Sequence, residues 1–492
     1  MPVDSTRTDY DEMRVKWSRL RDCFGGRDAI LKAGVRYCPS LPAKDVAENQ
    51  AYRERGNFYN AVKRTTEGMT GAIYQEPAEV EFPEAIKTYL DDITLTNIPF
   101  EMFSQAVGKE IMLVGRYGIL TDMPPEPVTD GRPYCVGYCA EDIINWRTTR
   151  IGGDDMLYHL VLRERKETPD PKDPFVCLTV TQYRVLRLEA GIATVELYQE
   201  QEKTGGDREW ISLGRTTLVR RGIALNFIPF VFICPSNVTP DLETPPLIDL
   251  ADVNLGHWRN SVDYEYGLHL VALPTPWVAG AKNSSTEPLP IGPSKVWELD
   301  QGGHAGMLEF TGQGLASIST AMSEKKKQMA TLGARLLEDS ATVQETASAV
   351  RMRHAGDVAN LRTIAGSIEL GLSMVLQTVA WWTGTEDKPA DTEASVELNK
   401  EYLNIKASSQ DIQAALQSLQ EHKISYATWY NILKTGGWTR EGISPEDELK
   451  SIEAEIAEEK KNNPEPQPPV VPPKKKTITG PDGAVKYQVT EE

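Results

Sequence analysis

The sequence predicts an α+β protein, and three observations support this fold class. Apolar residues recur at helical spacing near the N-terminus and again over one long segment that begins at residue 342. Between residues 117 and 235 the segments are instead rich in β-branched and aromatic residues, which is typical of strands. A stretch rich in proline and glycine separates two further helical segments between residues 247 and 337. With 492 residues, the chain is long enough for about three domains of roughly 150 residues each.

The charge balance limits the kinds of partner that the chain can have. Lys and Arg number 53, and Asp and Glu number 71, so the formal net charge is −18 and the pI is about 5.0. A surface this acidic repels nucleic acid, which argues against tight DNA wrapping but is compatible with DNA that slides past. The sequence has no run of about 18 apolar residues and no signal-peptide pattern, so we expect a product of the cytoplasm with no membrane partner.

The first part of the chain is predicted to be helical. Tyr10, Met13, Trp17 and Leu20 recur at the spacing of one helix face. Further helices are expected over three segments, two of which follow a proline that suits a first helical turn. These segments are 43–75, 83–94 after Pro83, and 99–115 after Pro99.

Five strand-like segments follow, separated by clusters of Pro, Gly and Asp. They are YGILTD at 117–122, MLYHLVLRER at 156–165, FVCLTVTQYRVLRL at 175–188, IATVELYQ at 192–199 and IPFVFI at 228–233. Six cysteines are too few for a disulfide framework in a chain of this length. Cys135 and Cys139 have no histidine nearby, so we expect buried thiols there rather than a zinc site.

The second half of the chain is predicted to contain three helices and one insertion. A helix is expected over 247–271, an insertion rich in proline and glycine over 272–313, and a second helix over 314–337. From 342 to 383, apolar or small residues recur in steps of three and four, which predicts one helix about 60 Å long at 1.5 Å per residue. Such a helix must span a large particle or an assembly.

The end of the chain is predicted to be a small helical module followed by a disordered tail. Ser408, Ser425 and Ser444 are candidate N-caps, and Pro445 suits the first turn of the last helix. Beyond Lys461 the proline-rich sequence predicts an extended, disordered segment.

The sequence contains none of the usual motifs for catalysis or for cofactor binding. It has no GxxxxGK[ST] phosphate loop, no HExxH, no GxSxG and no EF-hand loop, and its six histidines stand apart from one another. We therefore expect no enzymatic activity, no cofactor and no metal. The basic cluster Lys325, Lys326 and Lys327 is a candidate for phosphate contacts, and a solvated helix face is the alternative for each lysine.

Seven segments stand out together. They are YRERGNFYNAVKRTTEGMTGAIYQEP at 52–77, EIMLVGRYGILTDMPP at 110–125, YCAEDIINWR at 138–147, TQYRVLRL at 181–188, LNFIPFVFI at 225–233, PPLIDLADVNLGHWRNSVDYEYGLHLVALPTPWVAG at 245–280 and HKISYATWYNILKTGGW at 422–438. In this order, over about residues 40–460, they resemble the portal proteins of tailed double-stranded DNA bacteriophages. The ends of this chain are shorter than those of better-known portals.

The resemblance implies a portal-like architecture with a mixed α/β wing, a two-helix stem, a small α/β clip, a long wing helix and a small helical crown. The implied ranges are wing 1–240, stem helix 241–271, clip 272–313, stem helix 314–337, tunnel loop 338–345, long wing helix 346–385, distal wing and crown 386–460, and tail 461–492.

The same resemblance, combined with the chemistry of the residues, gives three sets of candidate site residues. The stem and tunnel loop would line a DNA channel with Lys325, Lys326, Lys327, Arg335, Glu338, Asp339, Ser340, Thr342 and Gln344. The clip would dock partners through Trp277, Lys282, Lys295 and Trp297. Subunit contacts are expected at Trp258, Arg351 and Arg353, while Trp381 and Trp382 are either interface or core residues.

The function that the resemblance implies is that of a ring, dodecameric in this family, at one capsid vertex of the virion and assembled in the host cytoplasm. Double-stranded DNA would pass through the ring during packaging and ejection, with transient, non-specific backbone contacts. Expected partners are the terminase large subunit, a head-completion or adaptor protein, and the major capsid and scaffolding proteins. The residues alone leave two alternatives open: a cytoplasmic hydrolase whose carboxylates converge only in the fold, and a head-morphogenesis scaffold without a channel.

Overall fold

The chain folds into two compact units, Met1–Tyr402 and Leu403–Glu492, and each contains helices and strands. The α+β prediction is therefore confirmed. The computed structural model describes residues 2–124, 131–151, 153–170, 173, 175–202, 208–271, 275–281, 296–308, 313–334, 347–400, 402, 409–421, 423–435, 439, 444–462, 475–479 and 485–490.

Helices form the first part of the first unit, as predicted. They are α1 (Thr8–Gly25), α2 (Arg27–Ala33), the 3-10 turn η1 (Gly34–Arg36), α3 (Val46–Glu54), α4 (Ala61–Ile73), the 3-10 helix η2 (Glu84–Asp91) and α5 (Phe100–Val114). The segment after Pro83 is a 3-10 helix rather than an α-helix. Gly115 has a φ of 74° and ends α5 in the left-handed conformation, which glycine adopts without steric cost.

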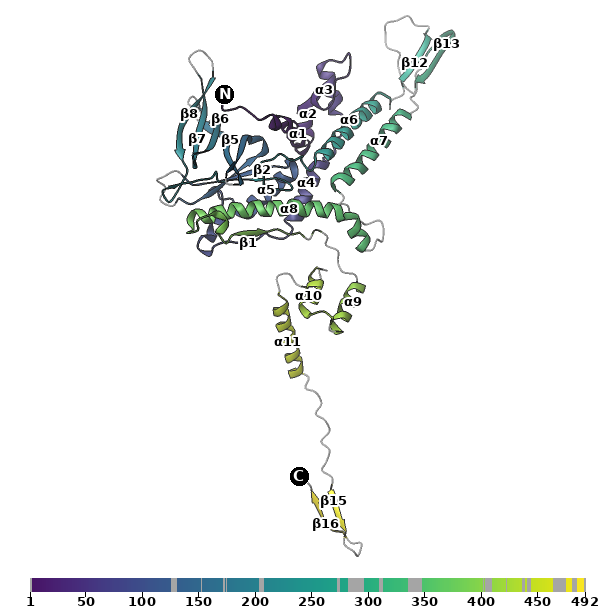
Figure 1. Ribbon diagram of the computed structural model, residues 1–492. Coiled ribbons are helices and arrows are strands. Elements are labelled where there is room, and N and C mark those ends of the chain that lie inside the picture. The colour runs from purple at the N-terminus through teal and green to yellow at the C-terminus, as the bar shows by residue number, and fades with distance from the viewer. Residues whose placement is uncertain are drawn as a thin grey trace. The chain divides into compact units, whose positions relative to one another are not determined.

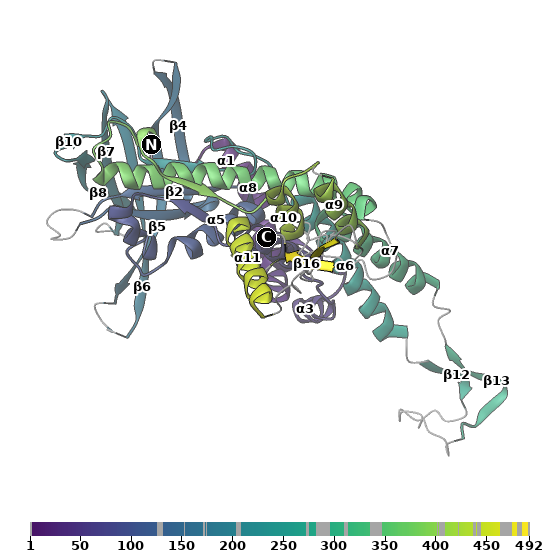
Figure 2. The same cartoon turned by 90° about the horizontal axis from the view of Figure 1, so that it is seen from below.

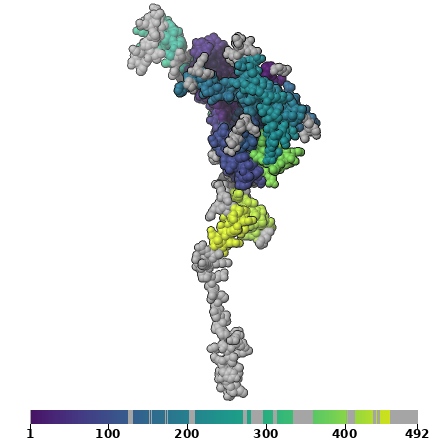
Figure 3. Space-filling model, turned by 90° about the vertical axis from the view of Figure 1, so that its left-hand side faces the viewer, coloured from purple at the N-terminus to yellow at the C-terminus, as the bar shows by residue number. Residues whose placement is uncertain are grey.

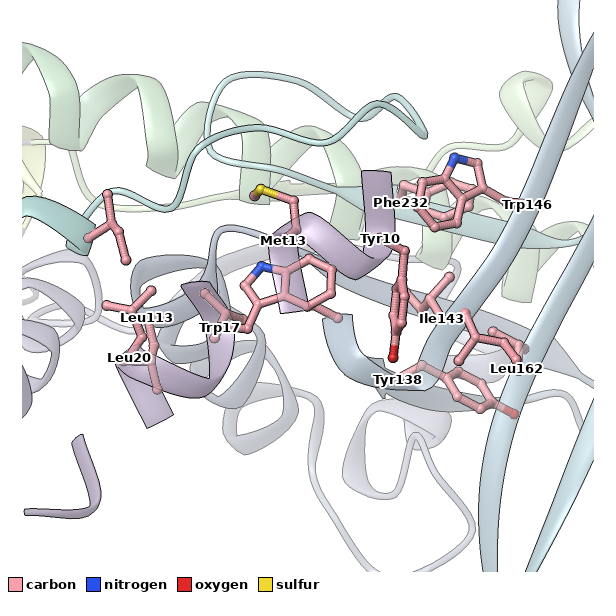
Figure 4. Close-up of a cluster of buried hydrophobic side chains, with 14 of the residues drawn as sticks. Tyr10, Met13, Trp17, Leu20, Leu113, Tyr138, Ile143, Trp146, Leu162 and Phe232 are labelled. Carbon is pink, nitrogen blue, oxygen red and sulfur yellow. The ribbon is translucent and has the colours of Figure 1, made fainter. Parts of the chain in front are cut away.

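The predicted apolar face of α1 lies in the first of two hydrophobic cores. Tyr10, Met13, Trp17 and Leu20 are all buried. Figure 4 shows them together with buried side chains from α5 and from the strands that follow: Leu113, Tyr138, Ile143, Trp146, Leu162 and Phe232. Full burial of an apolar side chain of this size contributes about 1.5–3 kcal/mol. The spacing seen in the sequence therefore also explains why α1 packs against the strands.

The largest sheet is an antiparallel meander in the order β4-β5-β6-β7-β8. Its strands are β4 (Ile143–Ile151), β5 (Asp154–Pro169), β6 (Cys177–Glu189), β7 (Ile192–Glu202) and β8 (Arg208–Thr217). Ala190 and Gly191 have φ values of 51° and 76° and form the two-residue turn between β6 and β7, because two positive φ angles match the twist of a tight hairpin. In Figure 3 the blue and teal atoms of this sheet form a broad part of the visible face.

A second sheet has the order β11-β2-β3 and lies beside α5 and the long helix described below. Its strands are β2 (Tyr117–Asp122), β3 (Tyr134–Cys139) and β11 (Phe230–Ile233). All five strand-like segments of the sequence are thus strands. Cys135 on β3 is buried, as predicted, whereas Cys139 at the end of the strand is only partly buried. Burial raises the pKa of each thiol to about 12, which favours the unreactive protonated form. The remaining short elements of this unit are β1 (Glu79–Glu81), η3 (Ala140–Asp142), β9 (Val219–Arg220), β10 (Ile223–Ala224), η6 (Pro389–Asp391) and β14 (Ser395–Glu397).

The predicted long helix is present as α8 (Ala347–Thr383), a continuous helix of 37 residues. Its apolar row is buried in the second core against α5, β2 and β11. This row consists of Leu361, Ala365, Ile368, Leu372, Val375 and Val379. The part Ala359–Thr383 has the length and composition to cross a membrane, but 61% of its most apolar window is buried within the protein. This burial is what a core helix requires.

Between β11 and α8 the chain leaves the sheets and returns. The elements of this excursion are α6 (Ile248–Val271), β12 (Thr275–Ala281), β13 (Leu299–Leu308), α7 (Gln313–Met329) and the π-helical η4 (Ala330–Ala334). Figures 1 and 2 show α6 beside α7, with the β12–β13 hairpin at their far end. We call residues 248–334 the arm. Both predicted helices are confirmed, and the described part of the insertion between them is a β-hairpin without helix.

The second unit begins with three helices, α9 (Ser409–Gln420), α10 (Tyr426–Thr435) and α11 (Pro445–Asn462). Ser425 Oγ accepts a hydrogen bond from the backbone N–H of Thr428 at 3.2 Å, and Ser444 Oγ accepts one from that of Asp447 at 3.1 Å. Both residues are therefore N-caps, as predicted. Ser408 lies outside the described residues.

The prediction of a disordered tail beyond Lys461 is wrong for part of this segment. Strands β15 (Lys475–Thr479) and β16 (Val485–Thr490) pair as an antiparallel hairpin. The prediction of disorder rested on the prolines before residue 474. A second pattern predicts strands instead: β-branched and aromatic residues lie on both sides of the sequence Gly-Pro-Asp-Gly at 480–483. That composition is typical of two strands joined by a turn.

Two glycines of α8 give opposite predictions for stability. A Cβ atom at Gly371 would lie 2.5 Å from Ile233 Cγ1, whereas a Cβ atom at Gly366 would have nothing within 4 Å. We expect Gly371→Ala to lower the free energy of unfolding by about 1–3 kcal/mol through overpacking. We expect Gly366→Ala to raise it by about 0.5–1 kcal/mol, because alanine favours the helix. Urea unfolding followed by circular dichroism measures both changes, and effects of the same sign would contradict the close approach of α8 to β11.

Candidate nucleic-acid interface

The base of the arm is held by the N-terminal helices. Asn254 Nδ2 donates a hydrogen bond to the carbonyl oxygen of Tyr59 at 2.7 Å, and the backbone N–H of Asn57 donates one to Ser261 Oγ at 2.8 Å. The buried residues of α6 in the first core include Leu250, Leu255, Trp258 and Val262. Polar and apolar contacts together therefore fix the first half of α6.

Trp258 is a core residue, which corrects its predicted role as a subunit contact. Its side chain is 0% exposed, so it has no surface to offer a neighbouring chain. Its indole Nε1 lies 3.0 Å from the position that a Cβ atom would take at Gly56, so the ring fills the space that this glycine leaves. Trp381 and Trp382 are also buried, with ring centroids 6.0 Å apart, and both belong to the core.

The two arm helices contact each other where glycines of α6 face side chains of α7. A Cβ atom at Gly267 would lie 2.7 Å from Leu315 Cδ2, and one at Gly256 would lie 3.2 Å from Lys325 Cε. The glycine with the higher residue number faces the α7 residue with the lower number, so the two helices are antiparallel. The α7 residues on this side recur in steps of three and four, the spacing of one helix face, and are Leu315, Ile318, Met322, Lys325 and Met329. We call this contact the seam.

Burial decreases along the arm. Among the described side chains, Val262 is the last buried residue of α6 and Met329 is the one buried residue of α7. Leu270, near the far end of α6, is 56% exposed. The outer half of the arm, which projects from the rest of the first unit in Figure 1, has the seam but no core of its own.

The three lysines of the predicted DNA contact do not share one surface. Lys325 lies in the seam, half-buried over Gly256, whereas Lys326 and Lys327 are exposed. Consecutive residues of an α-helix point about 100° apart, so such a triplet cannot form one face. Lys326 and Lys327 remain candidates for phosphate contacts. Lys325 is instead a packing residue whose aliphatic stem covers α6.

His257 lies under these lysines and is almost completely buried. Neither of its ring nitrogens has a hydrogen-bond partner among the described residues. Its pKa is lowered because burial disfavours the imidazolium ion and because Lys326 and Lys325 add positive charge nearby. The imidazole is therefore neutral at pH 7, and the ring of Tyr59 lies near it, with the centroids 6.4 Å apart.

A basic groove that the sequence analysis missed borders on Lys325. It is a cavity of about 840 Å³ between α1, η1 and α6, with the charged lining residues Arg14, Arg19, Arg36, Asp252 and Arg259. Arg19 pairs with Asp252 at 2.6 Å, whereas Arg14 and Arg259 make no ion pair with any residue that the structure describes. Arg259 Nη2 lies 3.8 Å from the Cβ position of Gly256, against which Lys325 also packs, so the groove reaches the seam beside Lys325. Its arginines come from three elements, and no spacing in the sequence connects them.

The hairpin at the end of the arm exposes apolar side chains. Trp277 of β12 lies over Gly306, its partner in register on β13, and is 45% exposed. Val296 and Met307 are exposed as well, and Trp297 is half-buried. Exposed apolar side chains gathered at a projecting end are typical of a protein-binding surface. The docking role of Trp277 and Trp297 stays a prediction.

Most of the other predicted site residues stay predictions. Those outside the described residues are Lys282, Lys295, Arg335, Glu338, Asp339, Ser340, Thr342 and Gln344. Arg351 and Arg353 lie in the first turns of α8, where the structure describes the backbone but not these side chains. Within the described parts of the chain, no group of His, Cys, Asp and Glu side chains is arranged to hold a metal ion.

Comparison with known proteins yields one family model. The model of a domain of unknown function, DUF4055, matches residues 246–383, which include the arm and α8. A search of curated proteins finds no match. Among solved structures, a chain from the neck of a native GTA particle, computed with C12 symmetry, is similar over 80% of this chain and 94% of its own length. The sequence identity is 11% and the TM-score is 0.37, a likeness too weak to support a conclusion about this chain.

The neutral, buried His257 predicts a pH dependence of stability. Its pKa is lowered in the folded chain and returns to about 6.5 on unfolding, so the unfolded chain takes up the proton first as the pH falls. The free energy of unfolding should therefore fall below about pH 6.5, by up to about 1.4 kcal/mol per pH unit from this group. Urea unfolding between neutral pH and about pH 5.5 measures the slope. His257→Leu should reduce the slope, whereas His269→Leu, at an exposed position of the same helix, should leave it unchanged.

Proposed function

We propose that this chain is the subunit of a portal ring, through which double-stranded DNA enters and leaves the capsid of a tailed bacteriophage or a related particle. The observation that carries the proposal is the arm, in which two antiparallel helices leave the core at Val262 and carry a β-hairpin at their far end. The arm coincides with the stem and clip that the resemblance implies at 241–337. Likewise, α8 coincides with the implied long wing helix.

The energetics of the arm favour an assembly. A pair of helices held by one seam is marginally stable, because a single apolar stripe barely offsets the entropy lost in ordering both helices. A ring of such arms would bury the outer faces of α6 and α7 against neighbouring copies. In a closed ring every arm has a neighbour on both sides. A dodecamer at one capsid vertex is the form of this assembly that the resemblance implies.

The charge distribution is compatible with DNA that moves. Lys326, Lys327 and the basic groove supply a limited set of cations on a chain with a net charge of −18. Each phosphate that a fixed cation neutralises adds affinity through the release of counterions, so few cations keep the strand mobile. Contacts to phosphates position the duplex without reading its sequence. In this proposal the packaging ATPase is another chain, the terminase.

The exposed hairpin is the proposed docking surface for that terminase and, after packaging, for head-completion or adaptor proteins. Its apolar residues Trp277, Val296 and Met307 lie at the end of the arm that is farthest from the core. A partner that covers them removes apolar surface from water. In this proposal the ring has no catalytic activity and needs no cofactor.

Electron microscopy of the purified full-length chain tests the proposal directly. We expect ring-shaped particles with a central hole wide enough for a duplex, because the arms need lateral neighbours. Compact monomers would favour the cytoplasmic hydrolase, and rings without a continuous hole would favour the channel-less scaffold. Either outcome overturns the portal proposal.

A charge reversal at the exposed lysines tests the DNA contact. Lys326→Glu combined with Lys327→Glu should weaken binding of a short labelled duplex by about tenfold and reduce the salt dependence, since each lost phosphate contact lowers the slope by about one. Fluorescence anisotropy at several salt concentrations measures both quantities. Lys63→Glu combined with Lys87→Glu is the matched control, because both lysines are at least half exposed and lie outside the arm. Equal weakening in the two double variants would show a general charge effect instead of a specific surface.

A further inference from the structure

The helical part of the second unit has almost no core. It consists of α9, α10 and α11, and among its described side chains only Ala415 and Tyr430 are buried. Five of its larger apolar side chains are at least 36% exposed: Leu416, Ile432, Leu449, Ile452 and Ile456. Isolated helices of this length are marginal in water, because most helical stability comes from the packing of an apolar face. A further apolar contact would therefore stabilise these helices.

Three of the exposed side chains lie in one row along α11. Leu449, Ile452 and Ile456 follow one another in steps of three and four, which places them on the same side of the helix. We call these three residues the stripe, and they are 38%, 36% and 47% exposed. The start of α11 lies near α10, where burial and the Glu448 carboxylate raise the pKa of Tyr426. Figure 1 shows that the later turns of α11 extend beyond the other two helices.

Glutamates border the stripe on both sides. In the seven-residue notation abcdefg for paired helices, Leu449 and Ile456 occupy position a, and Ile452 occupies position d. The flanking positions e and g are then taken by four glutamates: Glu446, Glu448, Glu453 and Glu455. The ion pair that the structure describes within α11 joins Asp447 to Lys450 at 3.3 Å and involves none of the four. The stripe is therefore an apolar surface between two rows of negative charge.

These charges determine which partner fits. Where two helices pack along positions a and d, the e and g side chains of one helix lie near those of the other and set the choice of partner. A second α11 would bring glutamate against glutamate on both sides, and like charges placed together at an interface cost free energy. Lysine or arginine at the same positions of a partner would form ion pairs instead. The stripe therefore favours a basic helix and disfavours a second copy of this chain.

We propose that α11 is a docking site for a basic amphipathic helix of another protein. The partner covers Leu449, Ile452 and Ile456 with its own apolar face, and its lysine or arginine side chains pair with the flanking glutamates. The proposal concerns the second unit alone and goes beyond the proposed function. It stands whether or not the chain forms a portal ring, because neither the arm nor the DNA contact enters it.

Two synthetic helical peptides test the site on the full-length chain. Both contain three heptads with leucine at positions a and d, and one carries lysine at e and g where the other carries glutamate. Fluorescence anisotropy of each labelled peptide, titrated with the chain at about 0.15 M salt, measures the affinity. We expect the basic peptide to bind about tenfold more tightly than the acidic one, or better. Equal affinity for the two peptides, or no binding of either, would overturn the proposal.

Two double variants of α11 identify the surface that binds. Glu453→Lys with Glu455→Lys should weaken binding of the basic peptide about tenfold and strengthen binding of the acidic one, because the attraction and the repulsion are exchanged. Unfolding of α11 cannot produce affinity for the acidic peptide, so this exchange distinguishes a binding site from a loss of structure. Ile452→Ser with Ile456→Ser should weaken binding of the basic peptide without a change of charge, because apolar surface is no longer removed from water.

A matched charge change separates the site from the general field of the protein. Glu12→Lys with Glu76→Lys reverses two exposed glutamates of the first unit and should leave both affinities nearly unchanged. If this control alters the affinities as much as the α11 variant does, the effect is one of net charge and the proposal is wrong. Sedimentation velocity of Ile452→Ser with Ile456→Ser examines the other occupant. If these substitutions abolish a self-association that the unmodified chain shows, the stripe is an interface between copies and the proposal is again wrong.

Discussion

The extent of the hydrophobic core along α6 is the constraint on which the rest of the molecule depends. As far as Val262, the helix is fixed by apolar packing and by hydrogen bonds to residues 57–59. The next turn is still held by α3, because Tyr52 donates a hydrogen bond to Asp263 and its ring packs edge-on against Tyr266. Beyond Tyr266, the described contacts of α6 are those of the seam with α7, and Lys325 occupies one seam position where an apolar residue would pack better. The free energy gained from one such seam is small, so in the proposed ring neighbouring copies would add to the stiffness of the arm. On this proposal the ring, rather than the monomer, is the state in which the arm is fully packed.

The sequence alone predicted the structure wherever the periodicity of apolar residues within one helix, or a helix cap, determines it. The row Tyr10 to Leu20, the apolar row of α8 and the caps Ser425 and Ser444 were all predicted, because each follows from spacing within one element. Where several elements meet, sequence patterns could not decide. Trp258 was expected at an interface because it is large and aromatic, but the space beside Gly56 places it in the core, and only the fold brings these two residues together. The lysine triplet is a different case, since helix geometry alone separates Lys325 from Lys327, and the structure then shows which of them faces the seam.

The basic groove shows that the sequence also does not predict where charged side chains gather in the fold. Its arginines come from α1, η1 and α6, on a chain whose net charge of −18 predicts an acidic surface almost everywhere. A net charge describes the average field around a protein, whereas a binding surface depends on a few side chains that the fold brings close together. Arg259 next to Gly256 is the clearest example, because it extends the groove to Lys325 of α7 through a position that has no side chain of its own. The candidate nucleic-acid surface therefore became visible only when the three elements were placed side by side.

A conduit needs a bore of fixed width, and this width depends on the angle between successive copies. One contact between two rigid bodies leaves that angle free, whereas two contacts far apart define it. The arm and the five-stranded sheet are suited to these two roles, because one hydrophobic core contains buried residues of both, among them Trp258 of α6 and Trp146 of β4. Interiors packed to this density deform little, so a displacement at the sheet would be transmitted to the arm. A second contact between copies on the sheet would thus set the spacing of the arms in the proposed ring, and with it the width of the bore.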